Sequence, residues 1–474
     1  MSERLQQIFT KKNLIPLLVA AVVFALPFER IPSVDVSVFG MSITLRMSLL
    51  FCSALMLVAV PHIWQQRAKL KDPAFILLMT FLFTYLLSVL VSTDLKRAVA
   101  VWIFTTFTCL AGLAMAFLYN DANKRWIDRV IYLTTWIILI FGFYQFIGDS
   151  LGVPAQWTGL RELYVKSVLG FTRIQSTGLE PLYYANYLTI PLLYFSVKFL
   201  RGDDERPYLL ALIATQMILT VSRGAIVAAS AGLLLVLIIA GRKARYTQVL
   251  GLLGLILAGV ALALNISYFS TRPQQTKTTK PVQNNAVAVV QQATNYVPQD
   301  DRVRNRELAI DAFKQQPILG IGPGNFSNYS KSQVSIYRDW TGYIIANNEP
   351  AELLAEGGII NFVLLLGFFV LVWWRVVRHA WKLQTYEEVW TVVIAGFFVT
   401  MAIQYQTFST LYVIHLWVLV GIGLALTTPR LQVVSDVVTT QVRTLANASK
   451  KTSKTTGSSG KKRKSRKKSR TKKS

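Results

Sequence analysis

Long apolar runs separated by short polar segments recur along most of this chain. Each is close to the ~20 residues that a helix needs to cross a bilayer, although several are shorter. We count twelve such runs, at residues 14–28, 47–64, 74–92, 98–118, 130–147, 182–197, 208–221, 224–240, 249–266, 358–374, 389–405 and 410–428. Because 53% of the residues are hydrophobic and only 16% are charged, the pattern predicts an all-α integral membrane protein with about 12 transmembrane helices.

Lysine and arginine gather at every second connection between these runs, and this alternation predicts the orientation, because cytoplasmic loops retain positive charge. The basic clusters lie at residues 4–12, 67–71, 124–129, 198–206, 242–245 and 375–382. We therefore expect a multi-pass protein of the cytoplasmic (inner) membrane with both termini in the cytoplasm. Two outer loops are long, about 148–181 and 267–357. If the first run were instead a cleaved signal peptide, the remaining spans would need a different topology.

The formal net charge of +26 is concentrated at the C-terminus. Residues 450–474 contain thirteen Lys or Arg and no acidic residue, a composition that cannot bury a core. We expect one polytopic membrane domain at 1–445 and a disordered basic cytoplasmic tail at 446–474. The tail is predicted to bind anionic membrane lipids; a protein partner is the alternative, and no nucleic acid is expected.

Cysteine and histidine give no sign of a metal site. Cys52 and Cys109 lie inside predicted spans, which argues against a disulfide framework or zinc. Of the three histidines only His415 is placed where it could reach an outward site, and a histidine packed between helices is the alternative. We expect no metal and no cofactor.

Arg223 is the most informative single residue, because it lies in LTVSRGAIV between two apolar runs. The preceding run of about fourteen residues spans only about 21 Å of a roughly 30 Å hydrocarbon layer. Arg223 is therefore predicted to lie below the outer surface, where a charged side chain is costly unless it serves a function. The alternative is an arginine that snorkels and anchors the helix end.

Residues 317–362 combine a polar loop with the start of an apolar helix. The loop contains Gly320, Gly322 and Gly324 around Pro323, without the following Lys-Ser or Lys-Thr of a P-loop. This composition predicts a tight turn where backbone approaches a substrate. Before it, residues 302–316 have helical periodicity and stop at Pro317, which predicts an amphipathic helix at the outer membrane boundary.

These motifs together resemble the O-antigen ligase and polymerase superfamily. The resemblance rests on the Thr-x-Ser-Arg-Gly pattern at Arg223, on Arg173 in GFTRIQSTGLEPLYYANYL, on the early LPFERIPSVDV segment, on the glycine turn and on the Ala-Glu-x-Gly sequence after it. Arg302, fifteen residues before Pro317, has the spacing of a family arginine, although Arg304 and Arg306 are close.

The resemblance implies a fold like that of GT-C glycosyltransferases and a metal-independent transferase. Its donor would be a polyprenyl-diphosphate-linked oligosaccharide and its acceptor a hydroxyl of a glycan, lipid or protein. Guanidinium groups suit a diphosphate leaving group, whereas any of these arginines could also be an ordinary loop charge. The expected catalytic residues are Arg223, Arg173, Arg302 and Glu349, and the expected substrate-binding residues are Asn347, Asn348, Gly322, Gly324, Asn325 and Glu180. Arg97, on another outer loop, is a weaker candidate.

Asn347 departs from the family, which has a histidine at this position. Asparagine cannot accept the proton of an acceptor hydroxyl. Glu349 is our hypothesis for the base, with Asp339, Glu356, His415 or a mechanism carried by the arginines alone as alternatives. A lipid-linked glycan flippase or another polytopic transporter is the alternative function, although transporters usually place polar sites near mid-membrane.

Overall fold

A computed structural model describes residues 13–38, 41–161, 172–203, 206–271, 299–338, 342–382, 389–409 and 411–428. The described residues belong to one compact unit, which ends at Thr428. The predicted tail at 446–474 therefore lies outside the described residues.

A helix is found at each of the twelve apolar runs. These helices are α2 (Leu14–Ala25), α3 (Met47–Gln65), α4 (Pro73–Val89), α5 (Leu95–Leu118), α6 (Asp121–Ser150), α8 (Pro181–Arg201), α9 (Tyr208–Leu219), α10 (Arg223–Ala240), α11 (Tyr246–Thr271), α15 (Glu349–Lys382), α16 (Val389–Gln404) and α17 (Ile414–Thr427). Six of them, α3, α5, α6, α10, α11 and α15, are long and apolar enough to cross a membrane. The chain is thus a largely helical membrane protein, and the count of 12 spans stays a prediction.

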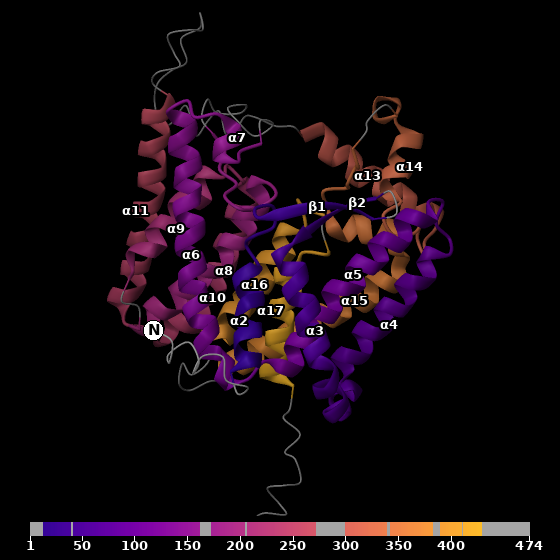
Figure 1. The fold of residues 1–474 in the computed structure, drawn as a ribbon, viewed down its shortest axis with the longest axis horizontal. Helices are drawn as coiled ribbons and strands as arrows, with labels where there is room; N and C mark the ends of the chain where they lie inside the picture. Colours follow the sequence, from indigo (N-terminus) through magenta and orange to yellow (C-terminus); the bar gives the residue numbers. More distant parts are fainter. Residues whose placement is uncertain are drawn as a thin grey trace, which may run out of the picture. The chain divides into compact units, whose positions relative to one another are not determined.

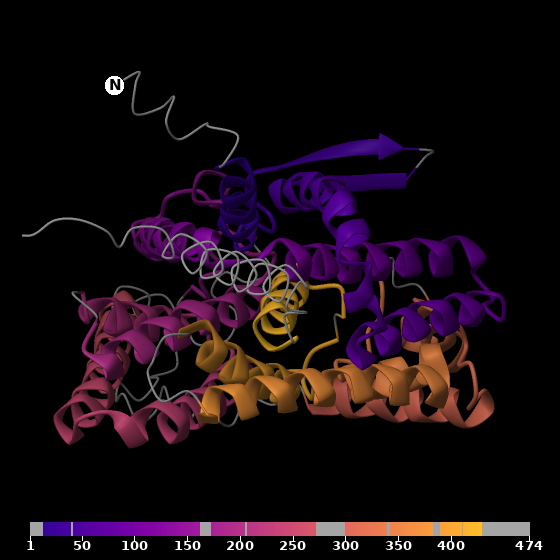
Figure 2. The same ribbon diagram turned by 90° about the horizontal axis from the view of Figure 1, so that it is seen from below.

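A β-hairpin is the exception to the all-α prediction. Strands β1 (Ser33–Val38) and β2 (Met41–Arg46) pair antiparallel, with Ser33 opposite Arg46. Valines alternate with Asp and Ser in β1, and this period of two is that of a strand and not of a helix. The two six-residue strands are much shorter than the long apolar runs from which the all-α fold was predicted. Figure 2 shows the hairpin on one side of the unit and the orange α15 on the opposite side.

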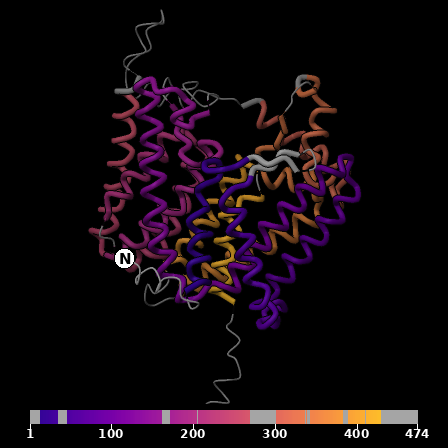
Figure 3. Tube along the Cα trace, in the orientation of Figure 1, coloured from indigo at the N-terminus to yellow at the C-terminus, as the bar shows by residue number. Residues whose placement is uncertain are grey.

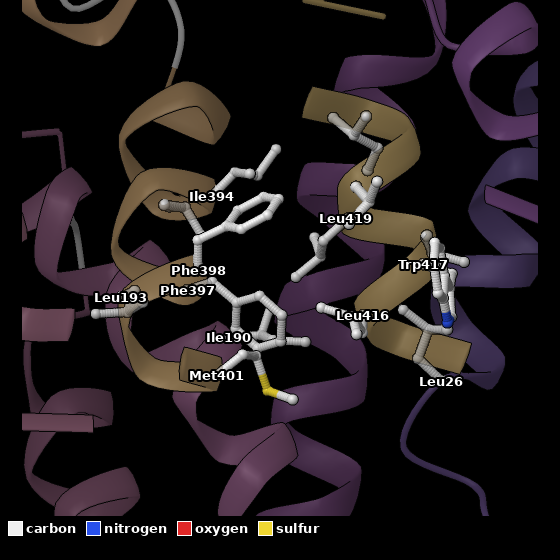
Figure 4. Close-up of a cluster of buried hydrophobic side chains, with 14 of the residues drawn as sticks. Leu26, Ile190, Leu193, Ile394, Phe397, Phe398, Met401, Leu416, Trp417 and Leu419 are labelled. Carbon is white, nitrogen blue, oxygen red and sulfur yellow. The ribbon is translucent and has the colours of Figure 1, made fainter. Parts of the chain in front are cut away.

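Close helix contacts at glycine hold the core together. A Cβ on Gly232 of α10 would lie 2.7 Å from the carbonyl oxygen of Gly396 in α16, and one on Gly112 of α5 would meet the backbone of Trp417 in α17 at 2.5 Å. Small residues let helices approach in this way in membranes. Large side chains fill the space beside these contacts, including Phe397 of α16 and Trp417 (Figure 4).

Short elements gather at one end of the unit. Helices α7 (Ala155–Thr158), α13 (Gln299–Gln315) and α14 (Phe326–Gln333) lie at the same end as the hairpin (Figures 1 and 3).

Short 3₁₀ turns occur at Arg67–Lys71, Gly241–Lys243 and Ser335–Tyr337. The helix predicted at 302–316 is confirmed as α13, and its Ala309 and Ala312 are fully buried, with α13 packed against α15.

The start of α15 corrects the predicted end of the second long loop. Helix α15 begins at Glu349 and not at Gly358, where the backbone bends with a φ of 70°. Residues 349–357 were left outside the apolar run because three glutamates and a proline interrupt them, but they form the first turns of the helix. Only glycine adopts this backbone conformation without strain, so the bend is a direct consequence of the sequence.

Candidate functional site

Arg223 and Arg173 meet at the turn that precedes α10. Arg223 is the first residue of α10, and Val221 just before it has a left-handed backbone with a φ of 52°. Arg173 Nε donates a hydrogen bond to the carbonyl oxygen of Thr220 at 3.0 Å, and Ile174 N–H donates to Leu219 O at 3.3 Å. The segment around Arg173 is therefore fixed to the turn that carries Arg223.

Arg302 approaches the same turn from α13. Its side chain remains exposed to solvent, but partial desolvation lowers its pKa, and the positive charge of Arg223 lowers it further. The second effect requires the two guanidinium groups to lie within electrostatic reach of each other. Arg304 is occupied elsewhere, in an ion pair with Asp301. The structure thus distinguishes Arg302 from its neighbour, which the sequence spacing did not.

Asn347 and Asn348 follow a segment that is attached to α13, the helix that carries Arg302. Asn305, one turn after Arg302 in α13, donates from Nδ2 to the carbonyl oxygen of Ile345 at 3.1 Å. Asn347 follows with a left-handed φ of 54°, a conformation that asparagine tolerates better than most residues. Asn348 caps α15, because its Oδ1 accepts a hydrogen bond from Ala351 N–H at 3.0 Å.

Residues 405–409, between α16 and α17, connect the asparagines back to α10. The backbone N–H of Asn348 donates to Ser409 Oγ at 2.8 Å, and that of Glu349 donates to Tyr405 O at 2.8 Å. On the other side, Thr407 Oγ1 lies 2.5 Å from the position of a Cβ on Gly224. Together with the hydrogen bond from Asn305 to Ile345, these contacts connect α10, residues 405–409, the start of α15 and α13 in sequence.

Glu180 lies at the start of α8, which reaches the same segment. It precedes Pro181, the first residue of the helix. The rings of Tyr183 and Phe408 meet edge to face at a centroid distance of 4.9 Å. Glu180 is therefore near residues 405–409 through its helix, while its own part in substrate binding stays a prediction.

The glycine turn is held by a carboxylate. Glu356 accepts hydrogen bonds from Gly324 N–H at 2.7 Å and from Phe326 N–H at 3.0 Å. Gly322 N–H donates to the backbone oxygen of Glu356 at 3.0 Å. Gly324 has a φ of 70°, and a Cβ on it would collide with Arg97 and Val101. These hydrogen bonds show that Glu356 has a structural role, because it holds the glycine turn.

Asn325 joins this turn to the loop before α5. Its Oδ1 accepts from Thr93 Oγ1 at 3.0 Å and from Asp94 N–H at 2.9 Å, and its Nδ2 donates to Pro323 O at 3.0 Å. These bonds occupy the amide of Asn325 inside the protein. Substrate contacts by Gly322, Gly324 and Asn325 stay predictions. The interactions that the structure shows for these residues position the loop.

Three glutamates share one face of α15. Glu349, Glu352 and Glu356 are spaced three and four residues apart, which places them together on a helix. Burial, followed by these three carboxylates, raises the pKa of Tyr412 to about 12, while Arg97 opposes the rise. The hydroxyl of Tyr412 therefore lies within electrostatic reach of the acidic face and of Arg97.

Two features of the site, Glu352 and residues 405–409, were not predicted from the sequence. Glu352 Oε2 accepts a hydrogen bond from Ala346 N–H at 2.7 Å and so closes the turn that contains Asn347. Its spacing from Glu349 and Glu356 could have identified it, had the helix start been placed at Glu349. Residues 405–409 carry no recognisable motif, and only their contacts reveal them.

Of the two other base candidates, His415 is separate from this arrangement. His415 is 1% exposed, with Nε2 3.3 Å from Asn186 Oδ1 and Nδ1 3.8 Å from Glu29 Oε1. It is packed among the helices, as the alternative interpretation has it. Asp339 lies outside the described residues.

The site can neutralise an anion with guanidinium groups and present amides and a carboxylate next to it. Repulsion between Arg223 and Arg302 is relieved when an anion binds between them. Among the described residues, no group of three or more His, Cys, Asp and Glu side chains is arranged to hold a metal ion.

A comparison with protein families finds one match. Residues 208–366 fit the family model described as O-Antigen ligase. This range contains Arg223, Arg302, the glycine turn and the residues 347–349, but not Arg173. No curated protein matches the chain.

Glu356→Gln should loosen the glycine turn, because an amide offers one acceptor oxygen where the carboxylate offers two, and its NH₂ would face a backbone donor. We expect a loss of about 1–3 kcal/mol of local stability. Faster hydrogen exchange at Gly324 and Phe326 would report it. Glu307→Gln, an exposed glutamate of α13, is the control. Unchanged exchange in Glu356→Gln would show that the carboxylate does not hold the turn.

Proposed function

We propose that this chain, which belongs to the O-antigen ligase and polymerase superfamily, transfers or polymerises a polyprenyl-diphosphate-linked glycan onto an acceptor hydroxyl. The family match supports membrane glycan handling of the ligase and polymerase type. The observation that supports the finer proposal is the hydrogen bond from Arg173 to the turn that carries Arg223, together with Arg302 lying within electrostatic reach of Arg223.

The arginines are proposed to stabilise the leaving diphosphate. A guanidinium donates two parallel hydrogen bonds to phosphate oxygens and stays charged at all relevant pH values. Negative charge grows on the diphosphate as the glycosidic bond breaks, so fixed cations there lower the barrier. On this proposal the arginines do the work of a divalent metal, and the enzyme is metal-independent.

The residues at the start of α15 are proposed to bind the acceptor. Asn347 would orient its hydroxyl and Glu349 would take its proton, while Asn348, whose Oδ1 caps α15 and whose Nδ2 donates to Gln406 O at 3.2 Å, would hold this turn in place. The acceptor oxygen then bonds to the anomeric carbon, the bond from that carbon to the diphosphate oxygen breaks, and its electron pair leaves with the diphosphate. Glu349 is proposed as the base because it directly follows Asn347 and Asn348, and its position at the start of α15 is fixed by the hydrogen bond from its backbone N–H to Tyr405 O.

We propose that the site faces the outer side of the cytoplasmic membrane in a fold of GT-C type. Helix α9 has 12 residues, about 18 Å, which is shorter than a hydrocarbon layer of roughly 30 Å. The turn carrying Arg223 would thus lie below the membrane surface, where the diphosphate of a lipid-linked donor resides. Both termini would be cytoplasmic, with the basic tail against anionic lipids.

Arg223→Ala, Arg302→Ala and Arg173→Ala should each reduce the transfer rate about 10²-fold or more. Arg223→Lys should also be poor, because a point charge does not replace the guanidinium fork. The measurement is product formation by purified protein with a polyprenyl-diphosphate oligosaccharide, followed by mass spectrometry. Arg304→Ala is the matched control on α13. Near-normal turnover in any of the three would remove that arginine from the site.

Transfer should continue in excess EDTA, because the diphosphate is neutralised by side chains. The same assay, run with and without chelator and then with added Mg²⁺ or Mn²⁺, checks this. Loss of activity with chelator and its return with a divalent ion would contradict leaving-group stabilisation by arginine alone.

Glu349→Gln should slow transfer about 10²-fold, because glutamine cannot take the acceptor proton. In the wild type the rate should fall as the pH is lowered and the carboxylate becomes protonated, and this acidic limb should disappear in the variant. Glu307→Gln again serves as control. An unchanged pH profile in Glu349→Gln would leave the base to another group.

A further inference from the structure

An exposed tyrosine lies close to the acceptor residues without contributing to the core. Tyr343 is 71% exposed, and it precedes Asn347 by four residues. The guanidinium of Arg97 lies over its ring, 3.4 Å from the ring centre. One face of the ring is therefore covered by Arg97, and solvent reaches the remainder.

The ring is held in place although it is exposed. Arg97 Nε donates a hydrogen bond to Gly324 O, so its position is set by the turn that Glu356 fixes. The next backbone N–H along the chain, that of Ile344, donates to Ser327 Oγ at 3.1 Å. A rigid aromatic side chain loses little conformational entropy on binding, which is why such residues anchor ligands.

The groups around the ring are polar and can exchange hydrogen bonds. The guanidinium of Arg97 covers one face of the ring, and Tyr412 and Glu352 lie within electrostatic reach of Arg97. An aromatic face backed by a guanidinium, with hydroxyl and carboxylate groups near that guanidinium, is complementary to a pyranose ring, which has C–H bonds on its faces and hydroxyls at its edge. The partly negative face of an aromatic ring attracts such C–H groups.

We propose that Tyr343, supported by Arg97, is a stacking platform for a pyranose ring of the acceptor glycan. The proposal rests on the transferase function and deepens it, because it makes the acceptor a saccharide and places its binding beside Asn347 and Glu349. Stacking here would hold the acceptor chain while its terminal hydroxyl reaches the anomeric carbon of the donor.

A tyrosine at the membrane surface can also serve as an interfacial anchor, and variants separate the two roles. Tyr246, 75% exposed at the start of α11, is the matched control. Tyr343→Phe and Tyr343→Trp keep a flat ring, whereas Tyr343→Ala removes it. An anchor would make Tyr343→Ala and Tyr246→Ala behave alike.

The test measures how tightly full-length protein in lipid nanodiscs binds oligosaccharides. The oligosaccharides are released by mild acid from the envelope polysaccharide of the source cell. Saturation-transfer NMR and titration calorimetry give the dissociation constant, and thermal unfolding checks each variant. We expect Tyr343→Ala to weaken binding about tenfold, with Tyr343→Phe and Tyr343→Trp within about threefold of wild type and Tyr246→Ala unchanged. The Tyr343→Ala loss should appear in the KM for the acceptor more than in kcat.

Equal affinity in Tyr343→Ala and wild type, or no binding by the wild type, overturns the platform. If the arginine variants abolish transfer while Tyr343→Ala binds normally, only the platform fails. If binding depends on Tyr343 while the wild type transfers nothing from a polyprenyl-diphosphate donor, the transferase proposal fails and the saccharide site stands.

Discussion

The start of α15 depends on a requirement of all helices, that the first backbone N–H groups find acceptors outside the helix. Here Asn348 supplies one acceptor from its own side chain, while Ser409 and Tyr405 supply the acceptors for residues 348 and 349. Residues 405–409 also lie against the start of α10 through Thr407. Satisfying these donors therefore brings the arginine turn and the asparagine pair to the same place.

A second constraint is the mutual repulsion of cations at this place. Partial desolvation lowers the pKa of Arg302, and the charge of Arg223 lowers it further. Such an arrangement is common where an anion binds, because the ligand relieves the repulsion that the free protein tolerates. The same helix, α13, is attached to the acceptor residues through Asn305 and Ile345. Donor and acceptor sites would thus share a single rigid support.

Two carboxylates at this end of the unit hold two different turns. Glu356 fixes the glycine turn and Glu352 closes the turn at Asn347. The glycine turn in turn holds Arg97, which supports the ring of Tyr343. A loop with no regular structure of its own can therefore be rigid, because two carboxylates satisfy its backbone donors. This rigidity is what a site needs in order to orient two large substrates.

The sequence by itself determined the positions of the twelve apolar helices and of α13, because hydrophobic runs, helical periodicity and Pro317 act locally. Through the family resemblance of motif and spacing it also predicted that Arg223, Arg173, Arg302 and the asparagine pair serve one site, and this stays a prediction. Only the tertiary structure decided that Arg302 rather than Arg304 faces Arg223, since both have nearly the same spacing. It also decided that α15 begins at Glu349, because polar residues in a first helical turn look like a loop until their caps are known. The contribution of residues 405–409 could not be read from the sequence at all, because it consists of hydrogen bonds and packing to residues far away along the chain.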